Sequence, residues 1–235
     1  MDAKGGYGQF CPVSMAAEIL CPRWTLLLLR EMCAGSTHFN ELRKGVPRMS
    51  PTLLSKRLKD LEIAGVVERV AAGGPGAPGG YEYRLTAAGQ ELRPIIHAIG
   101  LWGQRWVETR NSLKNLDPSL LMWDMRRNLD PTPLPRRRCV IHFLYPELPP
   151  RRQRWWLVIG EDGTDLCEKD PGFEVDLYVT TDLRTMTAIW MGLASVETEM
   201  RAGRLELDGD RAIARSMQRW LGLSSFAGEK KLARA

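Results

Sequence analysis

The chain of 235 residues is 44% hydrophobic, so it has enough apolar side chains for one large or two ordinary packed domains and is not of the disordered class. No stretch approaches the roughly 20 apolar residues of a membrane span, and the first ten residues have no signal-peptide pattern, so we expect a cytoplasmic protein. Five irregularly spaced cysteines without a Cys-x-x-Cys pair argue against a disulfide framework and a zinc site, so we expect free thiols and neither metal nor cofactor.

The excess of positive charge is confined to the first half of the chain. Residues 1–116 contain 15 Lys and Arg against 10 Asp and Glu, a net charge of +5, whereas residues 117–235 contain 18 of each kind. This division predicts that the first half meets a polyanion such as nucleic acid.

The first 49 residues predict three helices. A short helix begins after Cys11-Pro12, and residues 24–32 are so densely apolar that we expect a central helix buried on most sides. A third helix follows Ser36-Thr37, and residues 45–49 form a turn that leads into the next helix. This spacing is typical of a helix-turn-helix.

The helix from Ser50 to Gly65 has two distinct faces. Ser50 can cap its first turn, Pro51 suits the first helical position, and Gly65 supplies a left-handed stop. One face is apolar and the nearly opposite face carries hydroxyl groups and cations, the two sets being Leu54, Leu58 and Leu61, and Thr52, Ser55, Lys56 and Lys59. The pattern fits a DNA-recognition helix, and by itself it also fits an ordinary surface helix with a solvated basic face.

Residues 66–70 and 81–85 are predicted as the two strands of a hairpin, which directly after a recognition helix forms a wing. The Gly-rich run 71–80 is predicted as its flexible, uncharged tip. Any phosphate contact from the hairpin must therefore come from Arg69 or Arg84 at its base.

Thr86 is predicted to cap a longer helix, kinked near Pro94, whose large apolar residues recur at alternating spacings of three and four. Such a seam is typical of a helix that pairs with another helix, and the alternative is that it packs within the chain. A homodimer would set two recognition helices about one turn of duplex apart, on a two-fold symmetric operator. The seam residues are Leu92, Ile95, Ile99, Trp102 and Trp106.

Several separate motifs in residues 11–107 together resemble the HxlR family of winged-helix regulators. They are Cys11-Pro12-Val13, Arg23–Arg30, Phe39–Arg43, Ser50-Pro51, Leu54–Leu58, Leu61-Glu62, Gly65–Arg69 and Tyr83–Thr86. The resemblance implies a dimeric, DNA-binding transcriptional regulator of bacterial type. The chain departs from the family pattern at Cys21-Pro22, where a Gly-rich turn is usual, and in its long uncharged wing tip.

These patterns predict which residues contact DNA. Those nearest base edges are Thr52, Ser55 and Lys56, and those assigned mainly to phosphates are Arg43, Lys44, Arg48, Arg57, Lys59, Arg69 and Arg84. Some members of the family sense electrophiles or oxidants through a cysteine near the N-terminus, and Cys11 is the matching position. A cysteine there can also be a small buried hydrophobe.

The second half predicts one sheet with several helices. The expected strands are residues 139–145, 155–159, 165–168, 173–180 and 204–207, and the expected helices are 119–128, 182–190, one that starts at Ser195, and 210–221. Two arginine clusters, at 136–138 and 151–154, flank the first strand pair. They are candidates for phosphate contacts or for solvated sheet ends.

Residues 172–222, with Gly192-Leu193 and Met200–Asp210, resemble the end of sterol-carrier-protein-like domains. The resemblance implies an α+β fold with an apolar cavity that holds an acyl chain or another hydrophobic ligand. Met and Trp residues at such spacings also fit a plain core. The candidates to line the cavity are Trp155, Trp156, Met186, Trp190, Met191, Met200 and Met217.

Together the patterns predict an α+β protein with a winged helix-turn-helix and dimerisation domain at residues 1–110, a linker at 111–118 and a sterol-carrier-like ligand domain at 119–235. We expect a homodimeric DNA-binding transcriptional regulator that responds to a hydrophobic ligand. The alternatives are a lipid or small-molecule carrier whose helical half serves only dimerisation, and a thiol-based sensor acting through Cys11. Three isolated histidines, without a phosphate loop or nucleophile elbow, argue against an enzyme.

Overall fold

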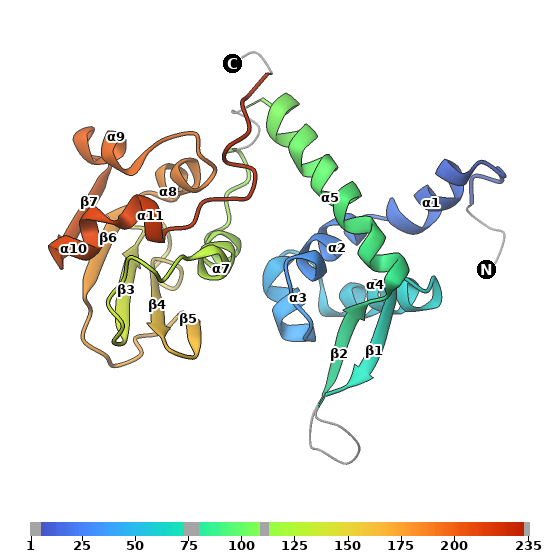
Figure 1. The fold of residues 1–235 in the computed structure, drawn as a ribbon, viewed down its shortest axis with the longest axis horizontal. Helices are drawn as coiled ribbons and strands as arrows, with labels where there is room; N and C mark the ends of the chain where they lie inside the picture. The colour runs from blue at the N-terminus through green and yellow to red at the C-terminus, as the bar shows by residue number, and fades with distance from the viewer. Residues whose placement is uncertain (1–5, 73–79, 109–112, 233–235) are drawn as a thin grey trace. The chain divides into compact units, whose positions relative to one another are not determined.

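The computed structural model describes residues 6–72, 80–108 and 113–232 (Figure 1). The chain divides into two compact units, residues 1–100 and 101–235. The first unit begins with α1 (Pro12–Leu20), α2 (Thr25–Cys33), α3 (Phe39–Gly45) and α4 (Pro51–Ile63). Among the described residues no single helix is long and apolar enough to cross a membrane, and α1 and α2 satisfy that test only as a pair bent by 82°.

The predicted helix-turn-helix is confirmed, with α3 and α4 as its two helices. The start of α3 is fixed by Glu41, whose carboxylate accepts hydrogen bonds from the backbone amides of Thr37 and His38 at 3.0 and 3.1 Å. The inner faces of α2, α3 and α4 share one core, to which α2 contributes Leu28, Leu29 and Met32. The expectation that α2 is buried on most sides is confirmed, and Leu27, which is 43% exposed, marks the side that faces solvent.

The predicted hairpin is also confirmed. Strands β1 (Val67–Ala71) and β2 (Tyr81–Leu85) are antiparallel, with Val67 opposite Leu85, and they project beyond the helices of this unit (Figure 1). Residues 73–79 of the predicted flexible tip lie outside the described residues.

After the hairpin, Thr86 caps the long helix α5 (Ala87–Trp106), because its hydroxyl accepts a hydrogen bond from the Gly89 amide at 3.2 Å. Pro94 lies inside this helix, as the sequence predicts. Leu92 packs against the core of the first unit, whereas the later seam residues are exposed.

The second unit contains a five-stranded sheet of order β5-β4-β3-β6-β7. Its elements are α7 (Pro118–Asn128), β3 (Cys139–Leu144), β4 (Arg154–Gly160), β5 (Gly163–Cys167), β6 (Leu177–Thr181), α8 (Leu183–Trp190), α9 (Val196–Arg201), β7 (Leu205–Gly209), α10 (Arg211–Arg215) and α11 (Met217–Trp220). Neighbouring strands are antiparallel except β3 and β6, which are parallel. This mixed α and β content agrees with the predicted class.

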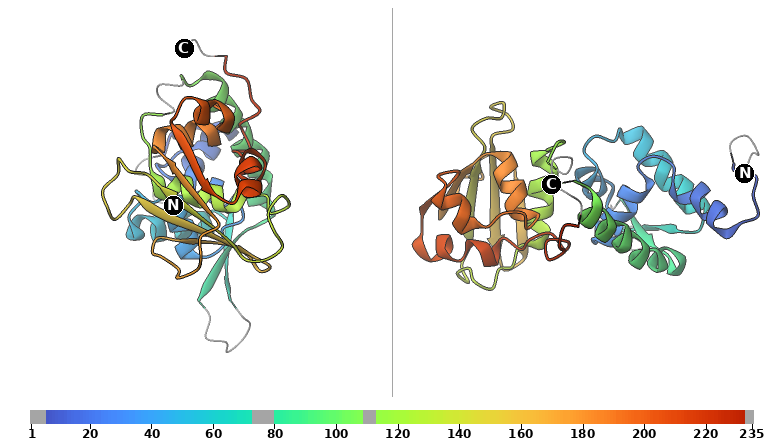
Figure 2. Two further views of the ribbon diagram at one scale, coloured as in Figure 1. Left: turned by 90° about the vertical axis from the view of Figure 1, so that its left-hand side faces the viewer. Right: turned by 90° about the horizontal axis from the view of Figure 1, so that it is seen from above.

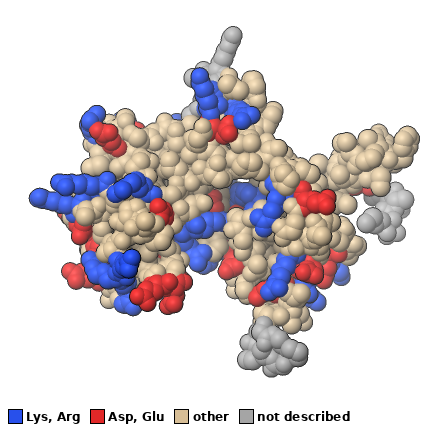
Figure 3. All heavy atoms as spheres, in the orientation of Figure 1, with Lys and Arg blue, Asp and Glu red and all other residues tan. Residues whose placement is uncertain are grey.

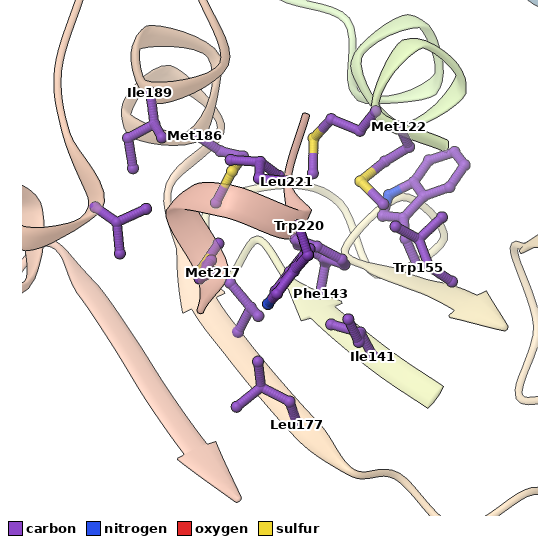
Figure 4. Close-up of a cluster of buried hydrophobic side chains, with 14 of the residues drawn as sticks. Met122, Ile141, Phe143, Trp155, Leu177, Met186, Ile189, Met217, Trp220 and Leu221 are labelled. Carbon is purple, nitrogen blue, oxygen red and sulfur yellow. The ribbon is translucent and has the colours of Figure 1, made fainter. Parts of the chain in front are cut away.

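One face of this sheet carries the core of the second unit. Inward residues of β3, β4 and β6 pack with side chains from α7, α8 and α11, so these helices lie on the same side of the sheet (Figures 2 and 4). Trp220 of α11 is fully buried among them, and its indole Nε1 donates a 2.8 Å hydrogen bond to the carbonyl of Ile213.

Two predicted elements of the second half have different bounds. The expected helix 210–221 divides at Ser216, whose hydroxyl donates to the carbonyls of Ala212 and Ile213 and competes with regular helix geometry. The expected strand 173–180 begins only at Leu177, because the chain must first cross from the edge strand β5 to a place beside β3. Phe173, at the start of that expected strand, is 41% exposed, and the Arg138 guanidinium lies over its ring.

Candidate nucleic-acid interface

The inner face of helix α4 packs firmly into the core of the first unit. Leu54, Leu58 and Leu61 are at most 1% exposed in the core of the first unit. The Ser50 hydroxyl accepts a hydrogen bond from the Leu53 amide at 3.3 Å, Pro51 occupies the first turn, and Gly65 ends the helix region with a φ of +71°. The helix therefore presents its outward side chains from a fixed frame.

The outward face of α4 carries the side chains predicted to contact base edges, together with Lys59, which is predicted to contact phosphate. Thr52, Ser55, Lys56 and Lys59 are all exposed. Among the described residues, neither Lys56 nor Lys59 forms an ion pair. Two hydroxyl groups and two unpaired ammonium groups are thus available on one helical face for base edges and phosphates.

Arg57, predicted to contact phosphate, is engaged inside the protein. Its Nη1 lies 2.9 Å from the Asp60 carboxylate, and its Nε donates a 3.2 Å hydrogen bond to the carbonyl of Arg23. The second bond ties α4 to the turn before α2, where Trp24 has a φ of +80°, a left-handed conformation that costs energy for a residue other than glycine. Arg57 therefore positions α4, and it is less available to DNA than the two lysines.

Three further predicted phosphate contacts lie in α3 and in the turn that follows it. Arg43, Lys44 and Arg48 are exposed. In the same region Arg30 donates to the carbonyl of Gly45 at 2.8 Å and pairs with the fully buried Glu31 at 2.6 Å, which fixes the end of α3 against α2. The end of α3 and the turn after it, which together carry the three cations, are thus anchored against α2.

The arginines of the hairpin are both engaged in local contacts. The Arg69 guanidinium lies 4.2 Å from the centre of the Tyr81 ring, and Arg84 forms an ion pair with Glu82 at 2.7 Å. A phosphate would have to compete with the Glu82 carboxylate for Arg84. Of the predicted DNA contacts, those of the hairpin are therefore the weaker ones.

The seam of α5 is exposed over most of its length. Ile95, Ile99, Trp102 and Trp106 are between 47% and 62% exposed, whereas Leu92 is half-buried. Apolar residues of this size along one helix are typical of a surface that another chain covers.

The sequence reasoning missed a second exposed apolar surface, around α1. This helix has no buried residue, and Phe10 and Val13 are 98% and 76% exposed. Its helical spacing of apolar residues was visible in the sequence, but spacing alone does not say whether the apolar face meets its own chain or another.

Cys11 is exposed at the start of α1. Hydrogen bonds from the backbone amides of Ser14 and then Val13 lower the pKa of its thiol. In contrast, burial raises the pKa of the Cys139 thiol to about 12. Cys11 therefore has more thiolate character than Cys139.

The seven residues predicted to line a ligand cavity in the second unit do not share one location. Trp155, Met186 and Met217 are buried in the core cluster (Figure 4). Trp190 is partly buried and packs against this cluster. Trp156 follows Trp155 on β4 and therefore faces the other side of the sheet, where its ring centre lies 4.7 Å from that of His142. Met191 is half-buried, and Met200 is 44% exposed. Among the described residues, no group of three or more His, Cys, Asp or Glu side chains is placed to hold a metal ion.

Comparison with known proteins places the resemblance in the first half of the chain. A family described as HxlR-like helix-turn-helix matches residues 19–111. The HTH-type transcriptional regulator YvaP of Bacillus subtilis is 38% identical over 101 residues, which are 43% of this chain and 92% of YvaP. The HTH-type transcriptional regulator sll1512 of Synechocystis is 34% identical over 101 residues, 43% of this chain and 73% of that protein. Among solved structures, the reduced transcriptional regulator YodB from Bacillus subtilis is 30% identical with a TM-score of 0.37, over 43% of this chain and 97% of that one.

Proposed function

Because the chain belongs to the HxlR family of helix-turn-helix proteins, we propose that it is a homodimeric transcriptional regulator that reads DNA with the outward face of α4. The observation that supports this most directly is the contrast across α4, with three buried leucines behind and free hydroxyl and ammonium groups in front. Thr52, Ser55 and Lys56 contact base edges, and Lys59, Arg43, Lys44 and Arg48 contact phosphates.

Two lysines of α4 test this proposal as a matched pair. Lys56→Ala changes the preferred operator sequence. Lys59→Ala weakens binding to all duplex sequences alike and lowers the slope of log affinity against log salt by about one. Both variants are compared with the wild-type protein by duplex selection from a random library and by fluorescence anisotropy across a salt series. Equal, sequence-independent losses from both variants would remove the assignment of base reading to Lys56.

Dimerisation through the α5 seam is part of the proposal. It is supported by the exposed large side chains of α5, and the exposed apolar residues of α1 add a second surface that a partner chain would cover. A two-fold dimer places the two α4 helices in successive major grooves of a symmetric operator. Sedimentation equilibrium should give twice the mass of one chain, and a monomer at micromolar concentration would contradict the seam.

The proposal includes a hydrophobic ligand that binds the second unit and regulates DNA binding, and this part rests on the sterol-carrier-like pattern of residues 172–222. Its core is rich in methionine, with Met122, Met125, Met186 and Met217 all fully buried, and methionine repacks readily around an apolar guest. A ligand would regulate DNA binding only if it bound two dimer states with different affinity. Native mass spectrometry of freshly purified protein tests for a co-purified lipid. A carrier without regulatory function would bind lipid and show no salt-dependent binding to duplex DNA.

Thiol sensing through Cys11 is the second candidate function, favoured by its exposure and its lowered pKa. The same chain supplies a control, because Cys139 is buried with its pKa raised to about 12. Iodoacetamide at neutral pH should alkylate Cys11 well before Cys139, as measured by peptide mass mapping. An inert Cys11 in the folded protein would remove this candidate.

A further inference from the structure

Helices α10 and α11 present a row of arginines on a rigid support. Their inner residues Ile213, Met217 and Trp220 are at most 2% exposed. The Asp210 carboxylate caps α10 by accepting hydrogen bonds from the amides of Ala212 and Ile213 at 2.7 and 3.1 Å. The outer face is therefore fixed in the same way as that of α4.

The outer face carries Arg211, Arg215 and Arg219, each four residues after the last. The chain keeps winding through Ser216, because its amide donates to the Ala212 carbonyl and its own carbonyl accepts from the Trp220 amide. Four residues rise about 6 Å along a helix, so Arg211 and Arg215 lie on one side of α10 and Arg219 follows about one turn later on α11, all three of them exposed. Figure 3 shows Lys and Arg side chains gathered in a row over α10 and α11.

Carboxylates compensate this row only in part. Hydrogen bonds from Thr132 chiefly lower the pKa of Asp130, and the charge of Arg219 adds to this, so Arg219 has a carboxylate nearby. Among the described residues, Arg211 and Arg215 form no ion pair. The acidic residues of β7, Glu206 and Asp208, alternate with leucines that pack on the core, so they face the side of the sheet opposite to these helices.

A second group of arginines lies at the same end of the sheet. Arg137 pairs with Asp176 at 2.6 Å, and the carbonyl of Asp176 accepts a 2.8 Å hydrogen bond from the amide of Asp210, the cap of α10. The start of β3 and the start of α10 are thus close together. Arg136 is exposed beside Arg137 and extends the positive surface.

We propose that Arg136, Arg211, Arg215 and Arg219, here called the arginine face, bind backbone phosphates of duplex DNA. Guanidinium groups match phosphate oxygens in a bidentate geometry, and several on one fixed surface suit a polyanion better than a single anion. The second half is neutral overall, with 18 basic and 18 acidic residues in 117–235, so the positive face arises from where its charges lie and not from their sum. This inference rests on the proposed function, which supplies the duplex.

The double variant Arg211→Gln/Arg215→Gln in the full chain tests the arginine face. Glutamine preserves helix propensity and removes both charges. Because phosphate contacts do not depend on sequence, a mixed-sequence duplex of about three helical turns is a sufficient probe. The slope of log affinity against log salt should fall by about two, and the affinity near physiological salt should fall at least about tenfold.

The matched control is Arg151→Gln/Arg154→Gln, which removes two exposed charges at the other end of the sheet. Arg151 precedes β4 and Arg154 begins it, and the start of β4 pairs with the end of β3. The control should keep the wild-type slope, and all proteins should give superimposable melting curves. Equal slopes for the control and the Arg211/Arg215 variant would overturn the arginine face.

Failure of this inference is distinguishable from failure of the proposed function. If Lys59→Ala lowers the slope but the Arg211/Arg215 variant does not, the reading by α4 stands and the arginine face is overturned. If the wild-type protein shows no salt-dependent duplex binding, both fall. Binding to vesicles of phosphatidylglycerol, lost in the Arg211/Arg215 variant while duplex binding is unchanged, would assign the face to a lipid surface and overturn the DNA assignment.

Discussion

The long helix α5 and the five-stranded sheet treat their large side chains in opposite ways. The sheet and its helices fully bury Phe143, Tyr145 and Trp220, whereas α5 leaves Trp102 and Trp106 more than half exposed. A buried indole stabilises the chain that contains it, and an exposed row of indoles and isoleucines stabilises a complex. The second unit, here called the sheet domain, therefore packs these large side chains in its own core, whereas the exposed indoles of α5 are the surface that the proposed dimer would cover.

The strongest test of this difference is Trp220→Ala. Trp220 is fully buried and hydrogen-bonded through its indole, so we expect a loss of about 3–5 kcal/mol in the free energy of unfolding of the sheet domain. Urea denaturation followed by circular dichroism measures it, with separate transitions fitted for the two units. The control Trp102→Ala, studied at a concentration where the protein is monomeric, should cost no more than about 0.5 kcal/mol. A similar loss from both would mean that Trp102 packs within its own chain.

The next largest effect is expected from Trp102→Glu. A carboxylate in the centre of an apolar helix seam should weaken dimerisation by about 2–4 kcal/mol, which is about thirtyfold to a thousandfold in Kd, as for a central interface residue. Analytical ultracentrifugation over a concentration series measures the change. Gln90→Glu adds a charge to an exposed position on another side of α5 and should leave the Kd within a few-fold of the wild-type value. An unchanged Kd for Trp102→Glu would place the dimer contact elsewhere.

Two serines test the same contrast in the first unit, because the Ser50 side chain caps α4 whereas the Ser55 side chain lies on its exposed face. Ser50→Ala removes the cap on the Leu53 amide and should lower the stability of the first unit by about 1 kcal/mol. Ser55→Ala should change stability by less than about 0.5 kcal/mol and alter operator preference instead. Chemical denaturation and duplex selection separate the two outcomes. Operator preference altered by Ser50→Ala alone would reverse the assignment.

The smallest predicted effect is a pH dependence of the sheet domain. Burial and then the charge of Arg154 lower the pKa of His142, and Asp170 opposes them in part. The unfolded chain therefore takes up a proton at a higher pH than the folded chain, so stability falls as the pH drops below the ordinary histidine pKa of about 6.5. Its Nε2 is buried without a hydrogen-bond partner among the described residues.

His142→Phe should remove this part of the pH dependence. Phenylalanine can keep the contacts with Trp156 and Tyr178, whose ring centres lie 4.7 and 5.5 Å from that of His142. Unfolding free energies measured between pH 7 and about pH 5 should decline less steeply in the variant than in the wild type. Identical slopes would show that His142 does not titrate differently in the folded and unfolded chain.

Much of the candidate interface could be predicted because its signals are local. The cap at Ser50, the proline at the first turn and the glycine after α4 fix that helix without reference to any distant residue. The alternation of buried and exposed positions then sets its two faces. Local sequence signals of the same kind predict the hairpin and the cap of α5 at Thr86, and the structure has both.

The predictions that differ from the structure concern residues whose partners are distant in the sequence or compete with the backbone. The sequence pattern assigns Arg57 to phosphates together with Lys59, yet its Nε donates a hydrogen bond to the carbonyl of Arg23, 34 residues away. The resemblance to sterol-carrier-like domains implies that Trp155 and Trp156 line one cavity, and the alternation along β4 places them on opposite faces of the sheet. The break at Ser216 comes from one hydroxyl group that competes with the helix backbone.

The helix-turn-helix, the hairpin, the apolar row of α5 and the positive charge of the first half follow from the amino-acid sequence, because caps and periodicity involve neighbouring residues and net charge is a sum over the segment. Which cations are engaged, which apolar faces pack against a core and which arginines share a surface follow from the tertiary structure alone. Arg136 and Arg211 are 75 positions apart in the sequence, and they lie at one end of the sheet because β3, β6 and β7 pair in that order. Ion pairing and burial depend on distances in space, and a linear pattern does not contain those distances.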